Sequence, residues 1–171
     1  ATAVTRREQP IFHSILSGKE VANAYGIIAG AGAFEKVHSL VPEVTAVHFS
    51  DGSVPYHLVV QIDKKFEGSQ RNAMMAAFVS LAFVKTVTVV DTDVDIYSVA
   101  DVDWAVATRC RYETDLLEIP ESIGHRLNPM VENDKWCRLG VDATVPLPRP
   151  DKFKRATMKQ VDLEQYDIEG A

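Results

Sequence analysis

The stretch VVDTDVDIYSVADVDWAVATRCRY, residues 89–112, combines the end of a strand, a group of aspartates and the start of a helix. The run TVTVV at 86–90 is nearly all apolar and predicts a strand buried on both faces, as in parallel or mixed sheets. Ser98 has the position of a helix N-cap, with Asp101 three residues further on, and apolar residues at helical spacing continue to Arg109. We therefore expect an α/β fold around this strand.

The aspartates Asp91, Asp93 and Asp95 are the first candidates for chemistry. In an extended chain alternate side chains point to one side, so their carboxylates are expected to lie together. Such a group could hold a hard cation such as Mg²⁺ or Ca²⁺. An EF-hand loop would need glycine at its sixth position and glutamate at its twelfth, where this sequence has Ile96 and Val102. The sequence therefore does not predict an EF-hand here.

A structural role is the favoured alternative for the three aspartates. At the end of a strand they could cap backbone amides and pair with Arg109 or Arg111, because structural ion-pair networks also gather acidic residues. We therefore favour a structural corner of Asp91, Asp93 and Asp95 with Arg109 or Arg111 over a metal site.

The remaining elements follow from hydrophobic spacing and turn residues. They are helices at 19–41 and 70–84, an antiparallel hairpin of strands at 44–49 and 56–63, a strand or connector at 10–16, and a strand at 116–119. The apolar face of the first helix is expected to consist of Ile27, Ile28, Phe34, Val37, Leu40 and Val41. The signal is poor after Pro120. The order predicts a layered α/β domain on a mixed sheet with an extended C-terminal tail.

Composition excludes several classes of function. The chain has 171 residues, 46% of them hydrophobic, and a net charge of −6, which disfavours a nucleic-acid partner. Two cysteines without a CxxC pair disfavour a disulfide framework and a zinc knuckle, and fit a reducing, cytoplasmic setting. The longest apolar stretch, 73–84, is too short to cross a bilayer, so no membrane association is expected.

Other motifs are weak. The pair Gly30 and Gly32 lacks the third glycine of a dinucleotide loop. The two hairpin histidines, His48 and His57, are expected to be satisfied residues of the sheet and not members of a site. Arg126 lies in a loop and could hold a carboxylate through two hydrogen bonds, although plain surface exposure is the alternative. The residues alone therefore name no catalytic group.

The stretch 89–112 resembles the hallmark of the UbiD family of reversible decarboxylases. Its members show an apolar strand followed by D-D-D-I-D-V-x-D, a short helix with W-A, and a T-R turn; Trp104-Ala105 and Thr108-Arg109 match the last two. The segments PIFHSILSGK, VVQIDKKFEGSQRNAMMAAF and LGVDATVPLP are also similar to family segments, in the family's order. The resemblance covers about residues 8–150 and is closest to ferulic acid decarboxylase-like members.

The resemblance implies that this chain corresponds to the last of three parts. In the family the earlier parts bind prenylated FMN with Mn²⁺ and K⁺ and carry the catalytic Glu-Arg-Glu group, so no catalytic residue is expected here. The last domain drives assembly into dimers or hexamers and closes the substrate pocket. The implied boundaries are a connector from an upstream domain at 1–17, the domain at 18–150, and a tail at 151–171 that docks on a neighbouring subunit.

The resemblance also suggests pocket residues for a small aromatic or α,β-unsaturated carboxylic acid. The matching positions are His125 and Leu127 in one loop and Ala82 and Phe83 before a strand. A polar His125 where relatives are apolar suggests a more polar substrate. A lysine that contacts the cofactor in such relatives is replaced by Val79, which puts a cofactor contact from this chain in doubt.

Two alternatives stay open at this stage. The chain could be a separate subunit of a multi-subunit carboxylase, with the cofactor domain on another polypeptide. It could also be a stand-alone oligomerising or ligand-binding α/β module that is not an enzyme.

Overall fold

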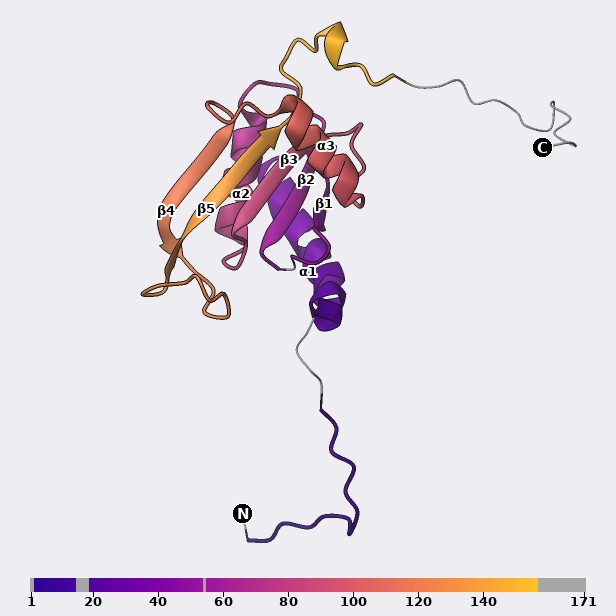
Figure 1. Cartoon of the computed structure of the whole chain (residues 1–171), viewed down its shortest axis with the longest axis vertical. Coiled ribbons are helices and arrows are strands. Elements are labelled where there is room, and N and C mark those ends of the chain that lie inside the picture. The colour runs from indigo at the N-terminus through magenta and orange to yellow at the C-terminus, as the bar shows by residue number, and fades with distance from the viewer. Residues whose placement is uncertain (1, 15–18, 54, 157–171) are drawn as a thin grey trace, which may run out of the picture.

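A computed structural model describes residues 2–14, 19–53 and 55–156 of the chain. These residues form a five-stranded sheet in the order β1-β2-β3-β5-β4 with three α-helices and one short 3₁₀ helix (Figure 1). The elements are α1 Lys19–Leu40, β1 Val44–Phe49, β2 His57–Ile62, α2 Ser69–Ser80, β3 Thr86–Asp91, α3 Val99–Arg109, β4 Leu116–Ile123, β5 Lys135–Ala143 and η1 Asp151–Phe153. The predicted layered α/β domain on a mixed sheet is thus confirmed.

Strand β3 lies at the centre of the sheet. It pairs in parallel with β2 and with β5, while β1 pairs antiparallel with β2 and β4 antiparallel with β5. The antiparallel hairpin of β1 and β2 agrees with the sequence. All residues of β3 after Thr86 are buried, which confirms that its apolar run is covered on both faces.

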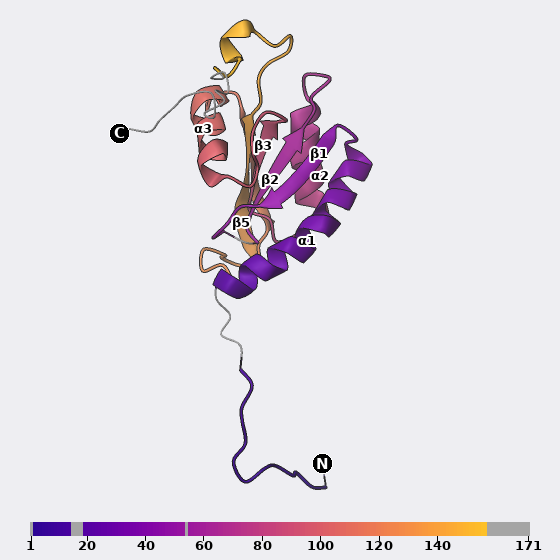
Figure 2. The same ribbon diagram turned by 90° about the vertical axis from the view of Figure 1, so that its right-hand side faces the viewer.

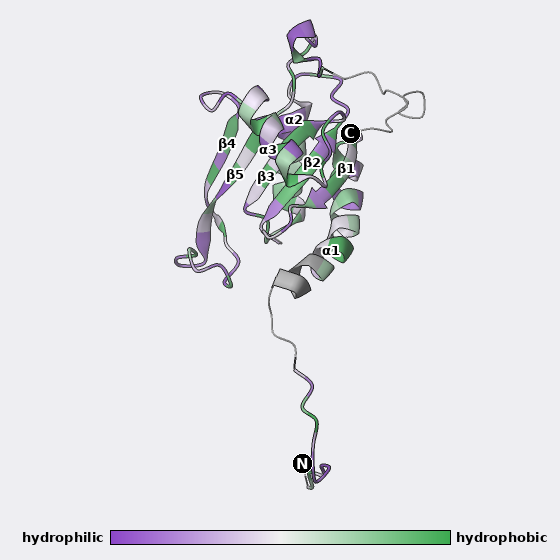
Figure 3. Ribbon diagram, turned by 45° about the vertical axis from the view of Figure 1, so that its right-hand side comes forward, coloured by the Kyte–Doolittle hydropathy of each residue, from purple (hydrophilic) through white to green (hydrophobic). Residues whose placement is uncertain are grey.

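Helices cover both faces of the sheet. Figure 2 shows α1 and α2 on one face and α3 on the other. Along β2 the side chains alternate: Leu58, Val60 and Ile62 belong to the core under α1 and α2, and Val59 belongs to the core under α3. Figure 3 shows hydrophobic residues along the strands and hydrophilic residues in most of the loops between them.

The second half of the sheet differs most from the sequence-based prediction. Strand β5 was not predicted, because buried Arg138 and Asp142 and the small Gly140 interrupt its apolar pattern. Strand β4 was predicted as 116–119 but continues to Ile123. Its register shifts between Ile119 and Ser122, where the chain contains a proline and a residue with φ of 55°. The bulge therefore hides half of the strand from a period-two search.

The helices also depart from expectation in detail. Helix α2 ends at Ser80 and not at Val84. The apolar face assigned to α1 is wrong for Ile27 and Ile28, which are 79% and 77% exposed, and for the exposed Leu40. The packed face has Ala33 at its centre together with Val37, which the sequence predicted correctly. Small side chains let this helix approach the sheet closely, and the prediction gave weight to the large ones.

The two ends of the chain are described in part. Residues 2–14 form no helix or strand, and the last two residues of the predicted 10–16 segment lie outside the described residues. Of the predicted tail at 151–171, residues 151–156 are described, so its docking on a neighbouring subunit stays a prediction. Although α1 has 22 residues, none of the helices described is long and apolar enough to span a membrane.

Replacement of Gly140 by alanine is predicted to destabilise the fold. A Cβ atom at this position would lie 2.6 Å from Sδ of Met74 and 3.2 Å from Cβ of Leu117, so the core between β5 and α2 would be overpacked. We expect a loss of about 1–3 kcal/mol in the free energy of unfolding, measured by urea titration. The matched control is Gly32→Ala, because Gly32 is helical and a Cβ there meets nothing within 4 Å. Equal stability of the two variants would contradict this packing.

Candidate functional site

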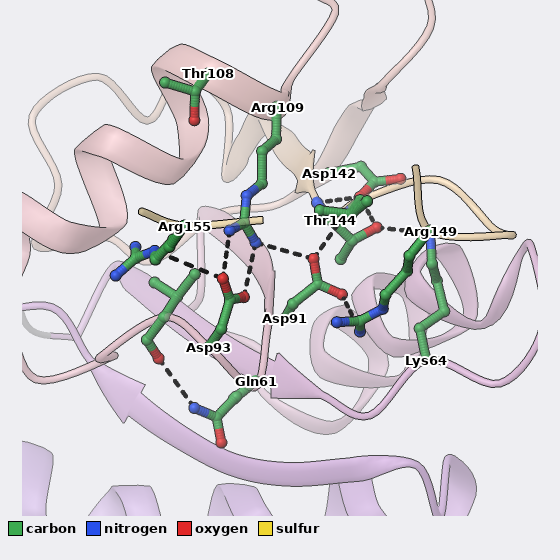
Figure 4. Close-up of polar contacts among 12 residues, drawn as sticks. Gln61, Lys64, Asp91, Asp93, Thr108, Arg109, Asp142, Thr144, Arg149 and Arg155 are labelled. Atoms are coloured by element: carbon green, nitrogen blue, oxygen red, sulfur yellow. Dashed lines mark hydrogen bonds and ion pairs between the residues drawn. The ribbon is translucent and has the colours of Figure 1, made fainter. Parts of the chain in front are cut away.

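Asp91 ends β3 and is the most enclosed acidic residue of the described structure. Its side chain is fully buried and accepts hydrogen bonds from Nη1 of Arg109 at 3.0 Å, Nη2 of Arg149 at 2.8 Å and the backbone N–H of Val145 at 2.7 Å (Figure 4). The two arginines come from the end of α3 and from the C-terminal segment. A single carboxylate therefore joins three parts of the chain that are distant in sequence.

Asp93 shares the guanidinium of Arg109. Nη1 and Nη2 of Arg109 donate to its two carboxylate oxygens at 2.9 and 2.6 Å, which is the strong bidentate geometry. Asp95 does not join them, since it is exposed and accepts from the backbone N–H of Tyr97 at 3.0 Å. The expectation that all three carboxylates point to one side is wrong for Asp95, because the extended strand ends at Asp91 and the chain then turns.

The start of α3 follows the sequence closely. Oγ of Ser98 accepts from the backbone N–H of Asp101 at 3.3 Å, which confirms the predicted N-cap. The carboxylate of Asp101 accepts from the backbone N–H of Asp95 at 2.7 Å and from Nη2 of Arg155 at 2.8 Å. The guanidinium of Arg155 also lies 4.0 Å from the ring centroid of Trp104. The C-terminal segment is therefore held against α3 of its own chain.

The two principal carboxylates differ in electrostatic environment. Burial raises the pKa of Asp91 even though its three hydrogen-bond donors favour the charged form. Hydrogen bonding to Arg109 lowers the pKa of the more exposed Asp93. The pKa of Arg109 is raised, against the effect of its burial, by hydrogen bonds and charge from these two aspartates.

The network continues toward β5. Nζ of Lys64 donates to Oγ1 of Thr144 at 2.9 Å, and that hydroxyl donates to the carboxylate of Asp142 at 2.6 Å.

The guanidinium of Arg109 fills the position between Asp91 and Asp93 that a cation would need. No group of three or more His, Cys, Asp or Glu residues with the arrangement of a metal site exists among the residues described.

The residues suggested as pocket lining lie at the opposite end of the sheet. Ala82 and Phe83 precede β3, and His125 and Leu127 follow β4. The ring of Tyr56, which precedes β2, lies 6.2 Å from that of His125 and 5.9 Å from that of Trp136. Leu127 is 80% exposed and is not a member of either buried core.

Arg138 supports this end of the sheet from below the surface. It is 5% exposed, and its two Nη atoms donate to the backbone carbonyls of Phe78 and Ala82, the latter at 2.9 Å. It thereby ties β5 to the loop that carries Ala82 and Phe83. Val79, at the position where the resemblance suggested a cofactor contact, is exposed at the end of α2.

The weaker candidates have ordinary structural roles. Gly30 and Gly32 lie inside α1, so they do not form a loop between a strand and a helix. Nε2 of His57 is 2.9 Å from Oγ1 of Thr88, and the ring of His48 packs on that of Tyr97. Arg126, which was considered for a substrate carboxylate, pairs with Asp134 on the surface instead.

Several residues of these networks were missed by sequence analysis. They are Lys64, Asp142, Thr144, Arg149 and Arg155 at the aspartate corner, and Tyr56, Trp136 and Arg138 at the other end. The available signal was the polar residues inside the apolar 135–149 region, and Arg149 between two prolines. Neither pattern names a partner.

Comparison with known proteins identifies the family. Residues 23–143 match the model of the 3-octaprenyl-4-hydroxybenzoate carboxy-lyase C-terminal domain, UbiD_C. The chain belongs to the UbiD family. The expected resemblance is thereby confirmed for the domain that contains the aspartate corner.

Known UbiD relatives extend well beyond this chain. It is 36% identical to anhydromevalonate phosphate decarboxylase of Methanocaldococcus jannaschii over 88% of its own length and 37% of that protein. It is 33% identical to gallate decarboxylase of Lactiplantibacillus plantarum, over 96% of this chain and 37% of that protein. A solved structure of the UbiD-class enzyme HmfF from Pelotomaculum thermopropionicum in complex with FMN matches with a TM-score of 0.83 and 37% identity, over 94% and 37%. The chain thus spans little more than a third of these relatives.

Replacement of Arg109 by methionine is predicted to destabilise this UbiD domain strongly. It would leave the buried carboxylate of Asp91 with one guanidinium fewer and that of Asp93 without its bidentate partner. Loss of one partner of a buried ion pair costs about 3–5 kcal/mol in the free energy of unfolding. Urea titration measures the change. The matched control is Arg111→Met, because Arg111 is 72% exposed and pairs with Asp115 at the surface. A stable Arg109→Met variant would refute the structural role of the corner.

Proposed function

We propose that this chain is the C-terminal oligomerisation and pocket-closing domain of a UbiD enzyme. The reaction that we infer for the whole enzyme is the reversible, non-oxidative decarboxylation of an aromatic or α,β-unsaturated carboxylic acid. Membership of the UbiD family and the two decarboxylases among its relatives support this reaction class. The unmatched length of those relatives is where we infer that the bond-breaking groups lie.

The observation that carries the proposal is the separation of two sites along the sheet. The residues suggested as pocket lining belong to loops at the end of the sheet where β2 and β3 begin, and among them the ring of His125 lies near that of Tyr56. Asp91 and Asp93 lie where β3 ends, and each of their carboxylates already forms an ion pair with a guanidinium. We infer that the first end faces substrate and that the second holds the fold together.

The position expected to contact the cofactor that the family implies does not fit that role. Prenylated FMN with Mn²⁺ and K⁺ needs cations or backbone amides for its phosphate and oxygen ligands for its metals. The residue at the expected cofactor contact, Val79, is apolar, and the residues described contain no metal-ligand group. We therefore assign cofactor binding to the upstream parts and assign no chemical step to this chain. Its inferred contribution is to exclude water from the pocket and to shape it.

The inferred partners follow from this division of labour. They are an upstream cofactor-binding domain or subunit, further copies of the chain in a dimer or hexamer, and the small carboxylic acid substrate. No nucleic-acid or membrane partner is proposed, and a cytoplasmic location is inferred from the cysteine content.

The alternatives make different predictions about the cellular protein. The same domain on its own polypeptide could serve as one subunit of a multi-subunit carboxylase or as a non-enzymatic module. Intact-mass analysis distinguishes them. A polypeptide of about three times 18.9 kDa that contains this sequence supports a single-chain enzyme. A native 18.9 kDa chain that copurifies with a flavin-bearing protein supports the subunit, and the same chain alone and colourless supports the module.

The 171-residue chain alone is predicted to be inactive. Purified protein should show no decarboxylase activity toward aromatic acids and no flavin absorbance, because the groups that bind the cofactor are assigned to other parts. A spectrum from 300 to 500 nm and a carbon dioxide release assay test this directly. Stoichiometric prenylated FMN on this chain alone would overturn the proposal.

Replacement of His125 by alanine in the complete enzyme is predicted to alter substrate preference more than stability. Its imidazole lies in a loop and makes one long hydrogen bond, with Nδ1 3.4 Å from the backbone N–H of Leu127, so folding depends little on it. We expect the ratio of kcat/KM between a hydroxylated and an unsubstituted aromatic acid to change about tenfold.

Arg126→Ala is the matched control, because Arg126 is the next residue in the same loop and its exposed side chain pairs with Asp134. A large drop in melting temperature with unchanged substrate preference for His125→Ala would contradict the assignment of this loop to the pocket.

A further inference from the structure

Arg138 is a buried cation without an acidic partner. Its side chain extends from β5 into the region between α2 and β4, and the residue is 5% exposed. No Asp or Glu carboxylate of the described residues lies within 4.0 Å of it, in contrast to buried Arg109. Desolvation lowers its pKa. A buried charge is normally compensated, so the missing anion needs an explanation.

The hydrogen-bond inventory of this guanidinium is incomplete. An arginine has five N–H donors, and Arg138 uses one on the carbonyl of Phe78 and one on the carbonyl of Ala82. Its Nε is buried and has no partner. Its planar group lies 5.6 Å from the ring centroid of Phe78, which fixes its orientation. Donors are thus left over on a guanidinium that is already held in place.

A cleft opens next to Arg138 on the same side of the sheet. It has a volume of about 280 Å³ and is lined by Phe78, Val79, Ile119, Ser122, Ile123 and Arg138. Val79 and Ile123 expose apolar side chains at its rim. The polar residues in its walls are Arg138 and Ser122, and the hydroxyl of Ser122 already donates to the carbonyl of Ile119. The other lining residues are apolar.

We propose that this cleft binds a small carboxylic acid, with the carboxylate on Arg138 and the apolar body between Val79 and Ile123. One guanidinium matches the single charge of a carboxylate and its planar geometry. The apolar walls favour a hydrocarbon body over a phosphate or sulfate, which would need more donors than the cleft supplies.

Binding here is coupled to the edge of the inferred substrate pocket. The guanidinium that would hold the acid also holds the carbonyl of Ala82, and Phe83 follows directly. An acid in the cleft would therefore stabilise one position of this loop. The proposal goes beyond the decarboxylase function and does not depend on it, because it rests on the environment of Arg138 alone.

The test measures benzoate binding to the 171-residue chain by NMR titration at low ionic strength. We expect saturable shifts of amides in residues 78–83 and 119–123, and an affinity about tenfold higher than for benzamide, which has the same body without the charge. Equal affinity for benzoate and benzamide would overturn the proposal, as would no saturable shift in these two segments.

A matched pair of surface variants tests the charge without disturbing the fold. Val79 is 84% exposed, so both Val79→Lys and Val79→Glu are expected to fold. A positive charge at the rim should strengthen benzoate binding about threefold, and a negative charge should weaken it about threefold. Identical benzoate affinities in the two variants would exclude the cleft as the site.

Arg138→Lys provides a second check that keeps the charge but removes the planar donor group. Benzoate affinity should fall about tenfold while binding of benzamide stays unchanged. Unchanged benzoate affinity would refute the assignment to Arg138. Failure of these titrations would leave the inferred decarboxylase untouched, because that function is tested with the complete enzyme.

Discussion

The ion pairs of Arg109 with Asp91 and Asp93 are the interaction on which the rest of the domain depends. They join the end of the central strand β3 to the end of α3, and Asp91 also binds the chain beyond β5 through Val145 and Arg149. Strand β3, helix α3 and the segment after β5 are therefore joined at one buried carboxylate. An unpaired charge in a buried site is costly in free energy. If the same elements packed in another arrangement, the carboxylate of Asp91 would be buried without its partners, and that arrangement would be less stable.

The two ends of the sheet differ in the residues that they bring together. Charged residues at the end of β3 pair with one another, so that among the described residues the carboxylates of Asp91 and Asp93 each accept from a guanidinium. The other end combines aromatic rings with the backbone loop before β3, which Arg138 supports. This arrangement is compatible with the proposed role, in which loops at one end of the sheet close over a site formed with other polypeptide segments.

The parts that sequence analysis predicted correctly share strong local signals. The apolar run of β3 and the N-cap at Ser98 are visible within a few residues, and so is the β1–β2 hairpin. Arg149 and Arg155 could not be placed, because their carboxylate partners lie more than fifty residues earlier in the chain. Strand β5 was hidden for a related reason: its polar residues are paired by tertiary contacts that no local period reveals. The pocket residues came from family resemblance, and nothing in their own spacing indicated a site.

The position of Arg149 and Arg155 has a practical consequence for where the domain ends. The family model stops at residue 143, yet Asp91 finds partners at Val145 and Arg149, and Asp93 and Asp101 find one at Arg155. An expression boundary drawn at the end of β5 would remove all three partners and open the corner to water. The contacts that hold this domain together accordingly extend past its last strand, to at least residue 155.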